Sequence, residues 1–200
     1  PLLDAQFDRN DMLVGTLDTG DILVWDLGLG GSSETLTVAA GASHPNAAAI
    51  SNSGRLLADG EGDDYRITSI ETGTVTMSID PAAEVIVKHQ VDTDPGDYRV
   101  VDAAFSPDDA LLATAVDHTG DLGGAVVLWD AATGEAVAVL GSPEHHDGAW
   151  SVSFSPDGTM LAASVNEGIT LWDLGTFEGA RIVPPDSALW WPSVSFSPDG

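Results

Sequence analysis

The chain has 200 residues, 43% of them hydrophobic, and carries 32 acidic against 6 basic residues, which gives a net charge of −26 at pH 7. Such a charge disfavours binding to nucleic acids and anionic membranes, because that binding needs lysine or arginine to displace counterions from phosphates. The absence of cysteine excludes disulfides and cysteine-based metal sites, and no apolar run is long enough to cross a membrane.

The first unit that the sequence predicts spans residues 2–40. The segment 7–11 has the composition of a turn, and eighteen residues after Phe7 the sequence Leu-Val-Trp-Asp ends with Trp25 and Asp26. Alternating apolar residues around these two points predict short β-strands.

A second, degenerate unit follows at residues 46–81. It has a turn at residues 50–54, and Thr68 stands 43 residues after Trp25 in the position of the tryptophan. The equal spacing indicates that the same repeat continues here without its Trp-Asp pair.

We predict an insertion between units at residues 80–98, because this connection is the longest in the chain. Residues 84–89 within it have the composition of a strand. The segment is therefore an added edge strand, a projection from the rim of the fold, or an irregular fourth strand of the second unit.

The third and fourth units, residues 99–141 and 149–184, are the clearest copies. Each begins with a strand that is followed by a Phe-Ser-Pro-Asp turn, in which proline fixes φ. The next residue is Gly158 in the fourth unit, which accepts positive φ, and Asp109 in the third. Each ends its third strand in Leu-Trp-Asp, and Trp129 and Trp172 are 43 residues apart. The phenylalanine motif recurs at Phe196, which predicts the first strand of a fifth unit over residues 190–200.

The fourth unit shows the internal pattern best, because turn signals separate four short strands in it. These strands are expected at residues 149–154, 160–165, 169–173 and 179–183. In the first of them, large side chains alternate with the small Ser151 and Ser153. A small second face is typical of a sheet that is covered on both sides.

Four short strands per unit, a period of 42 to 49 residues and a Trp-Asp pair at the end of the third strand resemble WD40 repeats. The resemblance covers essentially the whole chain. It implies an all-β fold, a WD40-type β-propeller with about four four-stranded antiparallel blades and the first strand of a fifth. Since rings of this family usually close with seven blades, we expect an incomplete ring here and further blades on both sides in the natural protein.

The resemblance also implies a buried tetrad of His, Ser or Thr, Asp and Trp in each blade. His145 matches the histidine position for Trp172, but Asn166 replaces the aspartate there, so we expect incomplete networks. The structural repeat positions that we predict are Trp25, Asp26, Trp129, Asp130, Trp172, Asp173, His145, Asp18, Asp117, Phe105, Phe154 and Phe196.

Residue types that support catalysis or metal binding are present, but their pattern is unsuitable. The segment 145–147 reads His-His-Asp near Ser151, yet no Gly-x-Ser-x-Gly elbow accompanies it. The acidic segments 59–64 and 92–97 lack the register of a calcium loop. We therefore predict no catalytic residue, no cofactor and no metal site.

Aromatic residues at or just before the first strands are the candidates for partner binding: Trp150, Trp190 and Tyr98, with His146 nearby. Tryptophan and tyrosine favour interfaces because they bury a large area at a low entropy cost. For Trp150 a core position between blades is an equal alternative, whereas for Trp190 we favour an exposed role.

The resemblance predicts a non-enzymatic scaffold or sensor that binds a protein or peptide, and no nucleic acid, in the cytoplasm. The regular copies are similar to those of bacterial WD40 proteins, in which the ring is often one module of a multidomain protein. An accessory or substrate-gating propeller of an enzyme and an extracytoplasmic, calcium-stabilised propeller are the alternatives. The acidic surface serves solubility or reflects a high-salt habitat.

Overall fold

The computed structural model places the backbone of four strands between residues 2 and 39 and both backbone and side chains over most of the remaining chain. The described ranges are residues 2–7, 12–17, 21–26, 35–39, 48–61, 64–89, 94, 97–119, 123–141, 148–166, 168–182 and 193–200.

These residues form four four-stranded antiparallel sheets, each made of strands consecutive in the chain. Sheet 1 contains β1 (Leu2–Phe7), β2 (Met12–Leu17), β3 (Asp21–Asp26) and β4 (Thr35–Ala39). Sheet 2 contains β5 (Ala49–Ile50), β6 (Leu56–Glu61), β7 (Asp64–Ser69) and β8 (Thr74–Ile79). Sheet 3 contains β9 (Tyr98–Phe105), β10 (Leu111–His118), β11 (Ala125–Asp130) and β12 (Ala136–Leu140). Sheet 4 contains β13 (Ala149–Phe154), β14 (Met160–Val165), β15 (Gly168–Asp173) and β16 (Gly179–Ile182).

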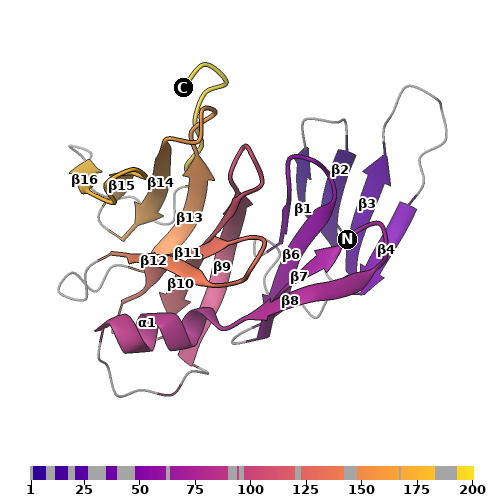
Figure 1. Ribbon diagram of the computed structural model, residues 1–200, viewed down its shortest axis with the longest axis horizontal. Coiled ribbons are helices and arrows are strands. Elements are labelled where there is room, and N and C mark those ends of the chain that lie inside the picture. The colour runs from indigo at the N-terminus through magenta and orange to yellow at the C-terminus, as the bar shows by residue number, and fades with distance from the viewer. Residues whose placement is uncertain are drawn as a thin grey trace.

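The expected all-β architecture is therefore confirmed. The sheets follow one another in chain order across the molecule and do not close a ring (Figure 1). Two cores join neighbouring sheets. Sheets 2 and 3 share one that contains Tyr65, Ile67 and Trp129, and sheets 3 and 4 share another that contains Leu128 and Trp172.

The repeated Phe-Ser-Pro-Asp motif forms the turn between the first and second strands. In sheet 3, Ser106 Oγ accepts a hydrogen bond from the Leu111 N–H at 2.9 Å and donates one to Asp108 Oδ1 at 2.6 Å. This donation is the main reason why the pKa of Asp108 is lowered. Ser155 and Asp157 repeat the arrangement in sheet 4. The motif is thus a local hydrogen-bonded unit that fixes the register of the hairpin.

The Trp-Asp pair serves two purposes at the end of the third strand. Trp129 is buried, whereas the carboxylate of Asp130 accepts hydrogen bonds from the N–H groups of Ala132 and Thr133 at 2.9 and 2.8 Å. Asp173 makes the corresponding turn in sheet 4. The pair therefore combines a core anchor with the turn into the fourth strand.

The strand interpretation of residues 84–89 is wrong, because Pro81–His89 form a helix, α1. The Asp80 carboxylate accepts a hydrogen bond from the Ala83 N–H at 2.9 Å, and Pro81 occupies the first helical position. Ala82 and Val85 lie on the buried side, whereas Val87 is exposed. The N-terminal cap and a helical face outweigh the β-branched composition. Helix α1 contacts all four strands of sheet 3 (Figure 1).

The first strand expected at residues 190–200 is not formed over the described part, residues 193–200. Within this part, the Val194 N–H donates a hydrogen bond to Ser151 Oγ of sheet 4 at 3.2 Å. In sheets 1 to 4 each first strand pairs with the strand that follows it, and none of the described residues after Phe196 forms such a strand. Pairing within the hairpin, rather than the strand's own sequence, therefore stabilises the extended form.

Asp109 connects the turns of sheets 2 and 3. Its φ is 61°, in the left-handed region, where the corresponding residue of sheet 4 is Gly158 with a φ of 73°. The half-buried carboxylate accepts hydrogen bonds from the N–H groups of Asn52 at 2.6 Å and Ser53 at 2.9 Å. Aspartate is retained in a strained conformation because it bridges two sheets.

Replacing Asp109 with alanine is expected to lower the free energy of unfolding by about 2–3 kcal/mol, because both bonds to the carboxylate are lost while the strain remains. Asp109→Gly should lose about 1 kcal/mol less, since glycine adopts positive φ without strain. Urea unfolding of the two variants measures both effects. A glycine variant more stable than the original chain would show that the contacts between the turns stabilise the fold by less than the strain at Asp109 costs.

Candidate protein-interaction site

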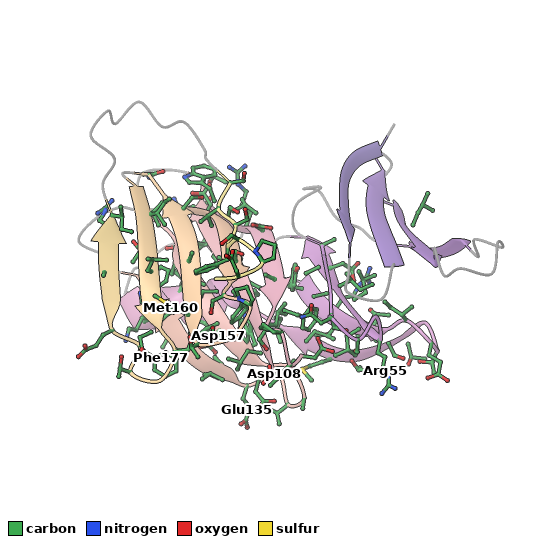
Figure 2. The ribbon with its side chains drawn as sticks, turned by 90° about the horizontal axis from the view of Figure 1, so that it is seen from above. Arg55, Asp108, Glu135, Asp157, Met160 and Phe177 are labelled. Carbon is green, nitrogen blue, oxygen red and sulfur yellow. The ribbon has the colours of Figure 1, made fainter. Side chains whose placement is uncertain are left out.

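The candidate site lies at one end of sheets 3 and 4. We call it the entry rim: the starts of β9 and β13 and the ends of β10 and β14, at Tyr98, His118, Ala149 and Val165. The opposite end carries the turns, where Asp108, Glu135 and Asp157 lie on the same side of the molecule (Figure 2). Of the residues predicted for partner binding, Tyr98 and Trp150 belong to the entry rim.

Trp150 is half-buried and held in a fixed orientation. A register shift between Ala149 and Ser151 takes it out of the regular alternation of β13. Its Nε1 donates a hydrogen bond to Asn166 Oδ1 at 2.7 Å. Asn166 occupies the position predicted for a tetrad aspartate and instead orients this indole. A large aromatic surface that is both accessible and held in place is suited to an interface.

Tyr98 is not an exposed residue, so its prediction as a partner-binding residue is wrong. Its side chain is 1% exposed and shares a core with Val85 of α1. The rings of Tyr98 and His118 meet edge to face with their centres 4.8 Å apart. Burial, with a smaller contribution from Asp97, raises the pKa of Tyr98. The sequence did not reveal this burial because the covering helix was not anticipated.

Asp117 joins the two sheets at the entry rim. It is 5% exposed, and its Oδ2 accepts a hydrogen bond from Arg99 Nη2 at 3.0 Å within an ion pair. A Cβ at Gly148 would collide with Asp117 Oδ1, so the chain entering β13 passes directly over this carboxylate. Arg99, opposite Asp117 in the β9–β10 pair, supplies the donor for which the tetrad uses a histidine.

Burial raises the pKa of Asp117 above its ordinary value of 3.8, and this effect exceeds the opposing effect of Arg99. The folded state therefore holds the proton more tightly than the unfolded state does. The resulting stability is complete below pH 3.8 and is lost as the pH rises through the raised pKa. Compared with Asp117→Asn, which cannot titrate, the original chain should be relatively most stable at about pH 3 and lose that advantage by about pH 7.

Urea unfolding across this range tests the sign, with Asp108→Asn as the control. The pKa of Asp108 is lowered, so its contribution is present above its ordinary pKa and is lost as the pH falls. The two variants should therefore diverge from the original chain in opposite directions. A pH-independent difference for Asp117→Asn would contradict the assignment.

The buried tryptophans of sheets 3 and 4 differ in their polar partners. Trp129 is 2% exposed, and its Nε1 donates to Thr114 Oγ1 at 3.0 Å. Trp172 is 6% exposed, but Ala163 stands where sheet 3 has Thr114. Sheet 3 therefore has the threonine, the aspartate and the tryptophan of the expected tetrad, with Arg99 in place of the histidine, whereas sheet 4 lacks the hydroxyl.

Some of the remaining predicted positions lie outside the described residues. Phe105 and Phe154 are buried, and Phe196 is half-buried. Trp25 and Asp26 lie on β3, where only the backbone is described. Four predicted residues lie outside the described residues: Asp18, His145, His146 and Trp190.

Sequence reasoning missed a pair of polar contacts between consecutive repeats. Asp102 Oδ2 accepts a hydrogen bond from the Val152 N–H of the next sheet at 2.9 Å. The bond from Val194 to Ser151 repeats this pattern one unit later. Asp102 and Ser151 both stand three residues before the phenylalanine of the turn motif. A polar residue at this fixed position inside a buried strand was the available signal.

Within the described ranges, no group of three His, Asp or Glu side chains is arranged to hold a metal ion. Of the acidic segment 59–64, the buried Asp59 instead forms an ion pair with Arg66 at 3.0 Å. No helix among these residues has the length and hydropathy needed to cross a membrane.

Comparison with known protein families gives a match to the model "WD domain, G-beta repeat" at residues 136–173. These residues run from β12 to the end of β15, so the family unit begins on the last strand of sheet 3 and covers three strands of sheet 4. The sequence repeat and the sheet are thus offset by one strand.

Two curated relatives and one solved structure extend this result. The chain is 38% identical over 73 residues to WD repeat-containing protein 1 of Gallus gallus, which is 36% of this chain and 11% of that protein. It is 30% identical over 138 residues to pre-mRNA-processing factor 19 of Oryza sativa subsp. japonica, which is 68% of this chain and 24% of that protein. The structure of Kuenenia stuttgartiensis hydrazine synthase matches with a TM-score of 0.65 at 18% identity, over 90% of this chain and 48% of that chain, which shows a shared fold.

Proposed function

Because this chain belongs to the WD40-repeat family, we propose that it is a non-enzymatic scaffold that binds a protein or peptide partner through the entry rim. WD40 repeats indicate a propeller scaffold for protein interactions. The observation that carries the proposal for this chain is Trp150, an indole that is half-exposed at the rim and held by Asn166 at 2.7 Å. A net charge of −26 supports a protein rather than a nucleic acid as the partner.

The proposal includes a role as one module of a larger, cytoplasmic, multidomain protein. The stretch that the chain shares with the two curated relatives amounts to only 11% and 24% of those proteins. Scaffolds of this kind bring other domains or chains together, and binding through a rigid rim suits that role because little ordering entropy is lost.

Photo-crosslinking in cells that contain the full-length protein tests the proposal. A photoreactive amino acid at Thr119, which is exposed at the entry rim, should crosslink to a discrete protein. Trp150→Ala should reduce this crosslink about tenfold, as expected for an aromatic anchor. The same amino acid at Glu135, exposed at the turn end, is the matched control (Figure 2). Equal crosslinking from both ends, or no dependence on Trp150, would refute binding through this rim.

A further inference from the structure

A cavity of about 250 Å³ lies between sheets 3 and 4. Its walls are the start of β11 and the end of β12 on one side, and the inner face of sheet 4 on the other. Ala149, the residue before Trp150, is part of the lining, so the cavity adjoins the entry rim. The interface described above and the cavity are therefore continuous.

The corresponding face of sheet 3 shows which side chains can fill a space of this kind. The strand registers place Val116, Val127 and Trp129 where sheet 4 has Val165, Thr170 and Trp172. In sheet 3 these side chains share a core with Ala82 and Val85 of α1. Within the described residues no helix covers the matching face of sheet 4, and the cavity lies there. Apolar side chains on a short peptide segment fill the equivalent position in the same molecule.

Two N–H donors, the Arg181 guanidinium and the Trp172 indole, distinguish this cavity from the corresponding space at sheet 3. Arg181, opposite Thr170 in β15, takes the place of Val139, which lies opposite Val127 in sheet 3. Trp172 lacks the hydroxyl that Thr114 offers to Trp129, because Ala163 occupies that position.

The backbone and the charge of the cavity lining also suit a ligand that has a hydrogen-bond acceptor. A Cβ at Gly179 would come within 2.7 Å of Trp172 Nε1, so glycine keeps the space around this nitrogen open. Among the described residues that line the cavity, none carries a carboxylate, although the chain has 32 acidic residues. An apolar wall with an indole N–H and a guanidinium complements a ligand that has an apolar group and a carboxylate.

We propose that this cavity binds a peptide segment of the partner protein, with a branched apolar side chain inside and a neighbouring carboxylate on Arg181. The volume of about 250 Å³ is below the roughly 300–1,000 Å³ that drug-sized ligands occupy, and it suits one or two side chains. The inference deepens the proposed function and depends on it, because the partner is the one that binds at the entry rim.

The probe is the peptide acetyl-Ser-Leu-Asp-Ser-amide, titrated into the ¹⁵N-labelled chain. The Trp172 indole N–H signal, assigned with Trp172→Phe, should shift more than the other tryptophan signals. The peptide with Asn in place of Asp has the same shape without the charge and should bind at least about tenfold more weakly. The peptide with Ala in place of Leu should also lose about tenfold.

Two arginine variants test the residue assignment. Arg181→Gln should abolish the difference between the Asp and Asn peptides. Arg55→Gln removes the same charge from an exposed site at the turn end and should leave binding unchanged within about twofold (Figure 2). Equal binding of the Asp and Asn peptides to the original chain, or an equal effect of both variants, would overturn the proposal.

Isovalerate, a free branched carboxylate, distinguishes a metabolite site from a peptide site. Binding as tight as that of the Asp peptide, with the same Trp172 shift, would overturn the peptide assignment. The outcome is separable from that of the crosslinking experiment. If the peptides leave Trp172 unaffected while Thr119 still crosslinks in a Trp150-dependent manner, the cavity proposal fails and the interaction rim stands.

Discussion

Replacing Trp129 with alanine is expected to lower the free energy of unfolding by about 3–5 kcal/mol, a large part of the 5–15 kcal/mol typical of whole domains. The indole is 2% exposed in the core between sheets 2 and 3. Its loss opens a cavity that the two packed sheets close only in part, because the surrounding structure relaxes only partially. It also removes the donor for Thr114 Oγ1.

Urea unfolding followed by circular dichroism measures this loss, and two variants separate its causes. Trp129→Phe keeps most of the volume but removes the Nε1 hydrogen bond, so it should cost about 1–2 kcal/mol. Trp150→Ala removes the same side chain from a half-exposed position and should cost less than Trp129→Ala. Equal losses for Trp129→Ala and Trp150→Ala would contradict the core position of Trp129.

Replacing Asp102 with alanine is expected to cost about 2–3 kcal/mol, although only a small side chain is shortened. The buried carboxylate accepts from the Val152 N–H at 2.9 Å and from the N–H of its own neighbour, Ala103, at 2.9 Å. Alanine would leave the Val152 N–H, inside the junction between sheets 3 and 4, without its acceptor. An unsatisfied buried donor costs about 1–3 kcal/mol, and a lost charged acceptor costs more than a neutral one.

Hydrogen exchange measures the effect of the Asp102 variants at this junction itself. In Asp102→Ala, the Val152 amide should exchange faster by a larger factor than amides in the middle of β11, which β10 separates from the strand of Asp102. Asp102→Asn keeps an acceptor oxygen in the same place and should restore most of the protection. If Asn and Ala variants behave alike, the charge of Asp102 and not its bond to Val152 stabilises the junction.

The parts of the fold that the sequence predicted are those whose chemistry is contiguous in the chain. The Ser106–Asp108 turn and the turn at Asp130 each close within five residues, so a repeated motif is enough to identify them. The four sheets follow from the spacing of these turns. The helix α1 was missed although its start, Asp80-Pro81, was visible, because Val85, Ile86 and Val87 suggested a strand.

The candidate site was predictable only in part, for a physical reason. The half-exposure of Trp150 depends on its own strand and on Asn166, both within one unit. The burial of Tyr98 depends on α1, which precedes it by a long connection. The contacts of Asp102 with Val152 and of Asp109 with Asn52 join residues 50 and 57 positions apart. Predicting such pairs requires the angle at which the sheets stack, and no local motif encodes that angle.

The junctions built by Asp102 with Val152 and by Ser151 with Val194 have the same register in successive repeats. The fourth unit therefore carries an acceptor for the unit after it, Ser151, and a donor to the unit before it, the Val152 N–H. A tandem duplication or a deletion of one whole repeat would bring a matching acceptor and donor together again. The number of units in an array of this kind can thus change during evolution without a new interface, whereas recombination out of phase would break every junction that it touches.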